Sequence, residues 1–140
     1  MSSIGKKVSL PTYPEIFGPG VWLMIHVLAI DSINDLAIDF FIEWIHKIIY
    51  RLSCKFCVKH AHDYLMLHPI EKYRGITNRY GTPDGMFRWS WEFHNNVNTR
   101  LGKDVINYDI AYNLYMPKYD QDNVDEIEEV TTICNYRKKT

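Results

Sequence analysis

The sequence predicts an all-α protein, built as a four-helix bundle with a short fifth helix. Three observations support this class. Apolar side chains recur every three or four residues, no segment alternates like a strand, and glycines and prolines punctuate the periodic segments. A chain of 140 residues with 46% hydrophobic content suits one domain with a modest core, and we find no internal repeat.

The first two helices are expected in the N-terminal third of the chain. Residues 1–16 show little periodicity, and we interpret them as a flexible arm. Gly18-Pro19-Gly20 is expected to interrupt the chain and to start the first helix. The apolar face of this helix carries Trp22, Ile25, His26 and Ala29. A second helix, with the longest amphipathic pattern, is expected from Asn34 or Asp35 to Leu52.

The third helix is expected to begin after Ser53, which is a good N-cap candidate. This start would put the sulfurs of Cys54 and Cys57 in the first helical turn. The helix would end near His68-Pro69, because the residue before a proline disfavours helical backbone. Residues 69–84 contain two glycines and two prolines, and we interpret them as a loop.

Two further helices complete the expected domain. The fourth runs from about Asp84 to Leu101, with Gly102 as its C-cap, and a short fifth covers about residues 107–116. The domain then spans residues 17–117. Residues 118–140 contain an acidic stretch followed by a basic end, and we interpret them as a flexible C-terminal tail.

The overall composition narrows the possible functions. The formal net charge of −1 gives no support to nucleic-acid binding by bulk electrostatics. No stretch reaches about 18 apolar residues without charges, so no membrane span is expected. The N-terminus lacks the apolar core of a signal peptide. We therefore expect a protein that is not secreted and that stays in a reducing cytoplasm.

The motif Cys54-Lys55-Phe56-Cys57 is the most informative feature of the chain. Two thiols three positions apart can close into a readily reducible disulfide, and a helix N-terminus favours the thiolate. Three interpretations stay open on the motif alone. They are a thioredoxin-type site, which needs a preceding strand that we do not see, a zinc site, and a redox disulfide beside a bound flavin. The histidines available to zinc are His60, His62 and His68.

A second motif combines Gly18 with Trp22 and His26. Trp22 and His26 are four residues apart and therefore share one helix face. A tryptophan beside a histidine is also common in an ordinary core. The aromatic content of 14% likewise fits either a core rich in rings or a site that stacks a flat cofactor.

A third motif runs from His94 to Lys103. Its amide and imidazole side chains lie beside core-facing Phe93 and Val97, where polar groups without partners are costly. A ligand rich in ring nitrogens and phosphates would supply those partners. A solvated helix face is the alternative explanation of the same pattern.

Together, the three motifs resemble the Erv/ALR family of FAD-linked sulfhydryl oxidases. The family pattern is a Gly-x-x-x-Trp-x-x-x-His helix, a Cys-x-x-Cys helix start and a His-Asn-x-Val-Asn-x-x-Leu-Gly-Lys segment. All three occur here in that order. The resemblance extends from Phe17 to Pro117. The single close cysteine pair resembles the compact versions carried by large cytoplasmic DNA viruses.

The resemblance implies an enzyme that holds FAD in the bundle and makes disulfide bonds in proteins. Substrate thiolate would attack Cys54, Cys57 would lie beside the flavin, and electrons would pass to dioxygen to give hydrogen peroxide. Lys103 would approach phosphate, and no metal is implied. The positions that match the family's FAD contacts are Gly18, Trp22, His26, Cys57, His60, His94, Asn95, Val97, Asn98, Lys103 and Tyr115.

The resemblance also implies partners and a location. The expected electron donors are thiol-bearing proteins, through a thioredoxin-like or Cys-x-x-x-Cys carrier, and finally virion proteins. We expect a homodimer in the host-cell cytoplasm, with packaging in virions as a further expectation. Residues 1–53 contain no cysteine, so a shuttle pair on the N-terminal arm is missing and electrons would enter Cys54 directly.

Two departures from cellular family members concern structure. Trp91 and Tyr108 stand where those members carry a structural disulfide, and an aromatic contact between them would replace the crosslink. Cys134 lies in the expected tail, where it could be an inert thiol, an intermolecular link or a substitute for the shuttle pair. We favour the inert thiol, because no second cysteine accompanies it.

Overall fold

The computed structural model describes residue 10 and residues 12–116. Over these residues it contains five α-helices, one short 3₁₀ helix and an isolated bridge between Thr77 and Pro83, which confirms the all-α class. The arm and tail expected at residues 1–16 and 118–140 lie mostly outside this part. The elements are α1 (Pro14–Asp31), α2 (Asp35–Arg51), α3 (Lys55–Leu67), η1 (Ile70–Tyr73), α4 (Gly85–Arg100) and α5 (Tyr108–Tyr115).

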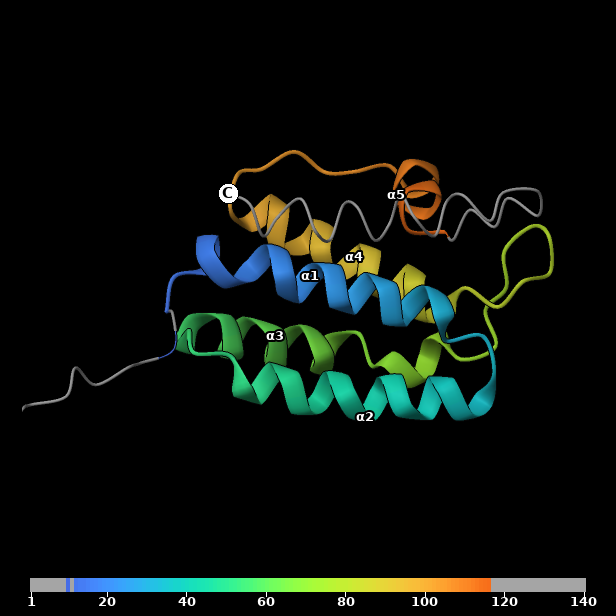
Figure 1. The fold of residues 1–140 in the computed structure, drawn as a ribbon, viewed down its shortest axis with the longest axis horizontal. Coiled ribbons are helices and arrows are strands. Elements are labelled where there is room, and N and C mark those ends of the chain that lie inside the picture. Colours follow the sequence, from blue (N-terminus) through green and yellow to red (C-terminus); the bar gives the residue numbers. More distant parts are fainter. Residues whose placement is uncertain (1–9, 11, 117–140) are drawn as a thin grey trace, which may run out of the picture.

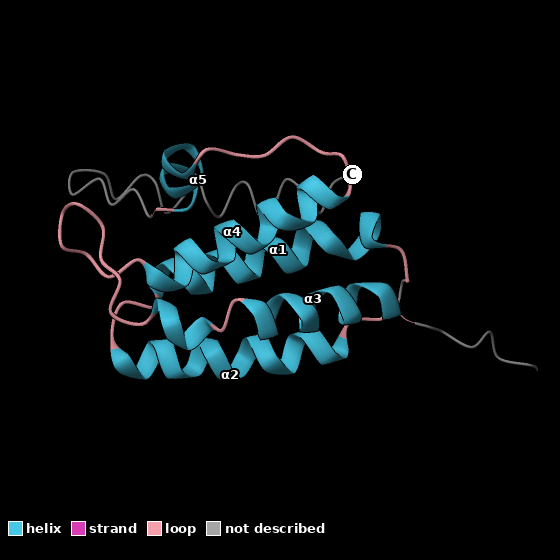
Figure 2. Ribbon diagram, turned by 180° about the vertical axis from the view of Figure 1, so that it is seen from behind, coloured by secondary structure: helices cyan, strands magenta, loops and turns pink. Residues whose placement is uncertain are grey.

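Helices α1 to α4 form a bundle in which successive helices run in alternating directions (Figure 1). Helix α1 packs on α4 and α2, and α3 packs on α2. Figure 2 shows the bundle from behind, with α1 and α4 above α2 and α3, and with α5 seen nearly end-on where it crosses α1 and α4. The alternation brings the starts of α1 and α3 together with the ends of α2 and α4 at one end of the bundle (Figure 1). All three motifs of the sequence meet there.

Helix α1 begins earlier than predicted. It starts at Pro14, whose fixed φ and missing N–H suit the first helical position. The prediction that Gly18-Pro19-Gly20 interrupts the chain is wrong, because α1 continues through this tripeptide. Pro19 removes only one donor, the one that would reach the carbonyl of Glu15. The helix persists because its downstream face is buried against the core.

The other helix ends follow local chemistry. The Asn34 side chain accepts a hydrogen bond from the Ala37 amide at 2.9 Å, which confirms the predicted start of α2. Helix α3 is capped by Cys54 and not by Ser53, because the Cys54 sulfur itself accepts from the Cys57 amide. Only Cys57 therefore lies in the first turn. Gly102 adopts a φ of +68° directly after α4, as expected for a helix terminator.

The core of the bundle is rich in aromatic rings. Phe41 and Ile45 of α2 and Phe87 and Trp89 of α4 are each 0% exposed. The indole N–H of Trp89 donates to the carbonyl of His68 at 2.8 Å, so the buried ring carries no unpaired donor. The burial of each such side chain stabilises the fold by about 1.5–3 kcal/mol. This core supports the two helices that carry most of the site, α1 and α4.

The segment predicted as a loop, residues 69–84, contains η1 and packs against α4. Gly85 marks the closest approach, since a Cβ added there would lie 1.8 Å from the carbonyl oxygen of Tyr73. None of the described helices is long and apolar enough to cross a membrane.

Candidate active site

A cleft of about 860 Å³ opens at the end of the bundle where the three motifs meet. This size suits a large organic cofactor, since ligand pockets typically measure about 300–1,000 Å³. Its wall includes ten of the twelve predicted site residues: Gly18, Trp22, Cys54, Cys57, His60, His94, Val97, Asn98, Lys103 and Tyr115. Only His26 and Asn95 lie outside it.

The two cysteines of the motif form a disulfide in the wall of this cleft. Their Cα atoms are 5.2 Å apart, and the Cys54 sulfur accepts a hydrogen bond from the Cys57 amide at 3.2 Å. The couple lies at the N-terminus of α3, where the helix dipole stabilises negative charge on sulfur. Both cysteines are partly exposed, and Phe56 between them is 75% exposed. A thiol from another molecule can therefore approach the disulfide.

The zinc interpretation is not supported. Among the described residues, no group of three or more histidine, cysteine, aspartate or glutamate side chains could hold a metal ion. A structural zinc site needs four ligands, and the two sulfurs of the motif are joined in a disulfide and are not thiolates.

Aromatic rings line one side of the cleft. Trp22 stacks on His94 with ring centroids 4.0 Å apart and planes 4° from parallel. Phe93 packs against Trp22 in an edge-to-face arrangement, with ring centroids 5.1 Å apart. These three residues come from α1 and α4, which the bundle holds side by side (Figure 1). The two rings cover each other's facing sides, and together they give this part of the wall an aromatic surface that suits packing by a flat heterocycle.

Polar and cationic groups complete the lining. Asn98 is 8% exposed, and its side-chain amide has no hydrogen-bond partner among the described residues. Because Asn98 lines the cleft, a ligand bound there can supply that hydrogen bond. The Lys103 amide donates to the Asn98 carbonyl at 2.8 Å, which ties Lys103 to the end of α4. Arg100 also lines the cleft.

Sequence reasoning missed Arg100 and Phe93 as lining residues. Both lie within the range of α4 that carries the third motif. The signal that could have found them is helical periodicity. Phe93 precedes Val97 by four residues and Arg100 follows it by three, so all three share one helix face.

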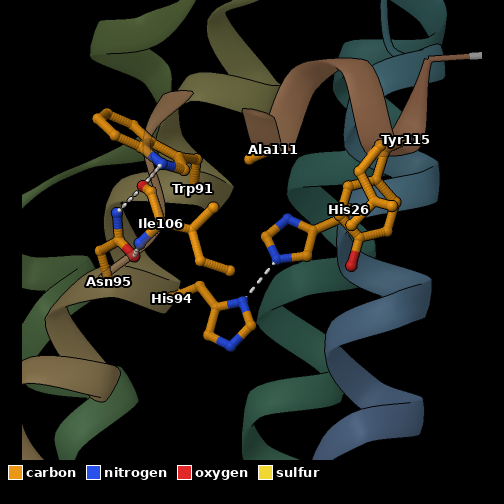
Figure 3. A pocket seen from close by; sticks show the side chains of 8 residues that line it. His26, Trp91, His94, Asn95, Ile106, Ala111 and Tyr115 are labelled. Atoms are coloured by element: carbon orange, nitrogen blue, oxygen red, sulfur yellow. Dashed lines mark hydrogen bonds between the residues drawn. The ribbon is translucent and has the colours of Figure 1, made fainter. Parts of the chain in front are cut away.

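His26 lies behind the cleft, in contact with the ring of His94. It is 4% exposed, and its Nε2 is 2.8 Å from Nδ1 of His94 (Figure 3). Its other ring nitrogen, Nδ1, is 3.0 Å from the hydroxyl of Ser90. Burial, with a smaller contribution from His94, lowers the pKa of His26 to about 3. Burial, and then the charge of Lys103, lowers the pKa of His94 to about 4. Both rings are therefore neutral at pH 7.

Asn95 is turned away from the cleft. Its side chain accepts from the Ile106 amide at 3.0 Å and donates to the Ile106 carbonyl at 2.9 Å (Figure 3). One residue after His94, it is rotated by about 100° around the helix and faces the segment before α5. Its contacts position that segment. A small cavity of about 30 Å³ separates Asn95 from His26.

Trp91 and Tyr108 are in contact, as the resemblance implies. Their rings meet edge to face at 5.3 Å and 84°, and the Trp91 indole donates to the Ile106 carbonyl at 2.7 Å. Tyr108 also hydrogen-bonds the buried carboxylate of Asp84. These contacts tie α4 to α5. Cys134 lies outside the described residues.

Comparisons with known proteins agree with this geometry. A family profile described as "Erv1 / Alr family" matches residues 19–120 of this chain. A protein named FAD-linked sulfhydryl oxidase, from a Kenyan pig isolate of African swine fever virus, is 33% identical over 102 residues, covering 71% of this chain and 79% of the relative. The protein of the same name from a Malawian tick isolate is 32% identical over the same shares.

Solved structures show the same fold. The yeast Erv1 core matches with a TM-score of 0.63 at 20% identity, over 85% of this chain and 96% of that one. A cysteine-to-serine double mutant of Erv1 from Saccharomyces cerevisiae has the same TM-score at 19% identity.

Proposed function

Because the chain belongs to the Erv1/Alr family, we propose that it is an FAD-linked sulfhydryl oxidase that makes disulfide bonds in protein substrates. The observation that carries this proposal is the position of the Cys54–Cys57 disulfide. It lies in the wall of a cleft whose other walls are aromatic, amide-bearing and cationic. A redox disulfide beside a site for a flat, phosphate-bearing cofactor is what this reaction needs.

The residues present fit FAD. The stacked rings of Trp22 and His94 give the cleft an aromatic wall, and the side-chain amide of Asn98 offers a hydrogen bond. Arg100 and Lys103 supply positive charge for a diphosphate. Smaller or flanking contacts to the cofactor are assigned to Gly18, His60, Val97 and Tyr115. When bound, FAD would supply a two-electron acceptor for the reduced Cys54–Cys57 pair and a site at which dioxygen is reduced to hydrogen peroxide.

His26 and Asn95 serve this site indirectly. His26 contacts the back of His94 and not the cleft, and Asn95 holds Ile106 in the segment between Lys103 and α5. We therefore treat both as residues that position the cofactor's neighbours, in place of the direct contacts that the resemblance implies.

The thiol chemistry belongs to the two cysteines. A substrate thiolate attacks the Cys54 sulfur, a mixed disulfide forms there, and Cys57 leaves as a thiolate in the first turn of α3. The N-terminal dipole of α3 stabilises that thiolate. A second substrate thiolate then attacks the mixed disulfide, forms the substrate disulfide and releases Cys54. The Cys54–Cys57 pair is now a dithiol, and it forms its disulfide again when its two electrons pass to an acceptor bound in the cleft.

The test compares three purified proteins in air: the wild type, Cys57→Ser and Cys134→Ser. We expect each to carry the yellow FAD absorbance, and the wild type and Cys134→Ser to consume dithiothreitol with release of about one peroxide per disulfide. Cys57→Ser should keep FAD and lose thiol oxidation. Full oxidation by Cys57→Ser, or a colourless protein with stoichiometric zinc, would contradict the proposal.

The finer features of the function are also proposals. The partly exposed disulfide, without a cysteine among residues 1–53, favours direct reduction by a thioredoxin-like or Cys-x-x-x-Cys carrier. The viral relatives favour action in the host-cell cytoplasm on virion proteins, with the enzyme packaged in virions. A homodimer would cover the apolar side chains that α1 and α2 leave exposed, and light scattering of the purified protein tests it. These side chains are Leu23, Met24, Val27, Leu36 and Phe40.

A further inference from the structure

A chain of hydrogen bonds runs from the bundle core to the cleft, and Ser90 lies at its inner end. Ser90 is 0% exposed on α4, and its hydroxyl oxygen is 2.7 Å from the carbonyl oxygen of Phe87. The same hydroxyl is 3.0 Å from Nδ1 of His26. The opposite nitrogen of His26, Nε2, is 2.8 Å from Nδ1 of His94. Figure 3 shows this last link, with the second nitrogen of His94 turned away from His26.

The inner end fixes the direction of every proton in this chain. A carbonyl oxygen can only accept, so the one hydroxyl hydrogen of Ser90 must point to Phe87. Ser90 therefore accepts from His26, and the hydrogen of His26 is on Nδ1. Nε2 of a neutral His26 then carries a lone pair and must accept from His94. The hydrogen of His94 is consequently on its own Nδ1.

Both imidazoles are neutral in this environment. Burial lowers the pKa of His26 to about 3 and that of His94 to about 4. A neutral histidine carries one ring hydrogen, so Nε2 of His94 has none. This nitrogen has no hydrogen-bond partner among the described residues, and His94 lines the cleft.

We propose that Ser90 and His26 are positioning residues that hold His94 in its Nδ1–H tautomer, so that Nε2 of His94 is a hydrogen-bond acceptor in the cleft wall. The acceptor selects a ligand group that donates, an N–H or O–H. FAD carries amino, imide and hydroxyl groups of this kind. The inference rests on the proposed function only in taking the cleft as the FAD site, since the tautomer follows from the protein alone.

Loss of the Ser90 hydroxyl removes the acceptor that sets the direction of the hydrogen bonds from His94 to Ser90. Without it, Nδ1–H of His26 has no acceptor in a buried position, which is unfavourable. The lower-energy arrangement moves the hydrogen of His26 to Nε2, from where it donates to Nδ1 of His94. His94 then carries its hydrogen on Nε2. The cleft wall changes from an acceptor to a donor, and a donor group of the ligand meets a second donor.

The test reads the tautomers directly, by long-range ¹H–¹⁵N correlation NMR of the FAD-bound protein. In the wild type, we expect His26 and His94 to carry hydrogen on Nδ1. In Ser90→Ala, both should shift to the Nε2–H form, and the dissociation constant for FAD should rise about tenfold or more. Ser32→Ala is the matched control, since Ser32 is also a buried serine, 4% exposed, whose hydroxyl donates to a helix carbonyl, that of Leu28, at 2.6 Å. Ser32 takes no part in the hydrogen bonds of His26 and His94. This control should leave both tautomers and FAD affinity unchanged.

Two results would overturn the proposal: a wild-type His94 with hydrogen on Nε2, or unchanged tautomers in Ser90→Ala. If Ser90→Ala does not fold, the wild-type spectrum still decides the first point. Ser90→Cys, which is close in size and replaces the hydroxyl with a weakly accepting thiol, then decides whether the wild-type tautomers depend on that group. Failure of the proposed function has a different signature, because a wild type that binds no FAD refutes the function whatever its tautomers.

Discussion

The contact between Gly85 and Tyr73 allows a sharp prediction about the packing that supports α4. In Gly85→Ala, the new Cβ would lie 1.8 Å from the Tyr73 carbonyl oxygen, 2.9 Å from its carbon and 3.4 Å from Cβ of Ile76. Real Cβ contacts essentially never fall below 3.0 Å, so α4 and η1 must separate by at least the difference of 1.2 Å. The obstacle is backbone, which cannot rotate aside like the end of a side chain.

The expected loss of stability follows from two opposing effects. Overpacking of this kind destabilises by about 1–3 kcal/mol, and the better helix propensity of alanine returns less than about 1 kcal/mol at a helix start. We expect a net loss of about 2 kcal/mol, or a Tm lower by roughly 5–10 °C. Gly20→Ala is the matched control, because no atom lies within 4 Å of its added Cβ. It should raise stability by up to about 1 kcal/mol.

The assay is thermal and urea unfolding of the wild type and both variants at one FAD concentration, with the Kd for FAD of each protein used to subtract the contribution of cofactor binding. A Tm of Gly85→Ala equal to or above that of the wild type would refute the packing argument. Gly20→Ala shows whether the assay resolves an effect of this size in the opposite direction.

Two further predictions concern the site and its support. The pKa of His26 is lowered from 6.5 to about 3 in the folded protein. Between these two pH values only the unfolded state takes up a proton on His26. The contribution of His26 to the free energy of unfolding is therefore complete above pH 6.5 and is lost as the pH falls toward 3. At pH 5 the loss should be about 2 kcal/mol by urea unfolding, and an equally steep pH dependence in His26→Gln would contradict this assignment. Trp91→Ala removes the indole bond to Ile106 and the edge contact with Tyr108, and should lower the free energy of unfolding by about 1–3 kcal/mol. Trp91→Phe should lose only about 1 kcal/mol, whereas an unchanged Tm in Trp91→Ala would count against an aromatic replacement of the crosslink.

The helices could be predicted from the sequence because their signals are local. The periodic face of α2, the Asn34 cap and the Gly102 terminator each act within a few residues, and each is found where it was expected. The predicted start of α1 was wrong because a long-range effect outweighed a local signal. Pro19 is a local signal for a break, but burial of the helix beyond it outweighs one missing hydrogen bond.

The motifs by themselves determined which residues approach the cleft, since the spacing of the cysteines, of Trp22, and of the third motif puts them on facing helix surfaces. Only the tertiary structure decided which neighbours turn away. Asn95 hydrogen-bonds Ile106, which is 11 residues away in the sequence. His26 lies behind His94 and hydrogen-bonds it across 68 residues of sequence. Ser90 belongs to no motif, and its part in the site exists only where α1 and α4 meet. Hydrogen-bond direction depends on such long-range contacts, which a linear pattern does not contain.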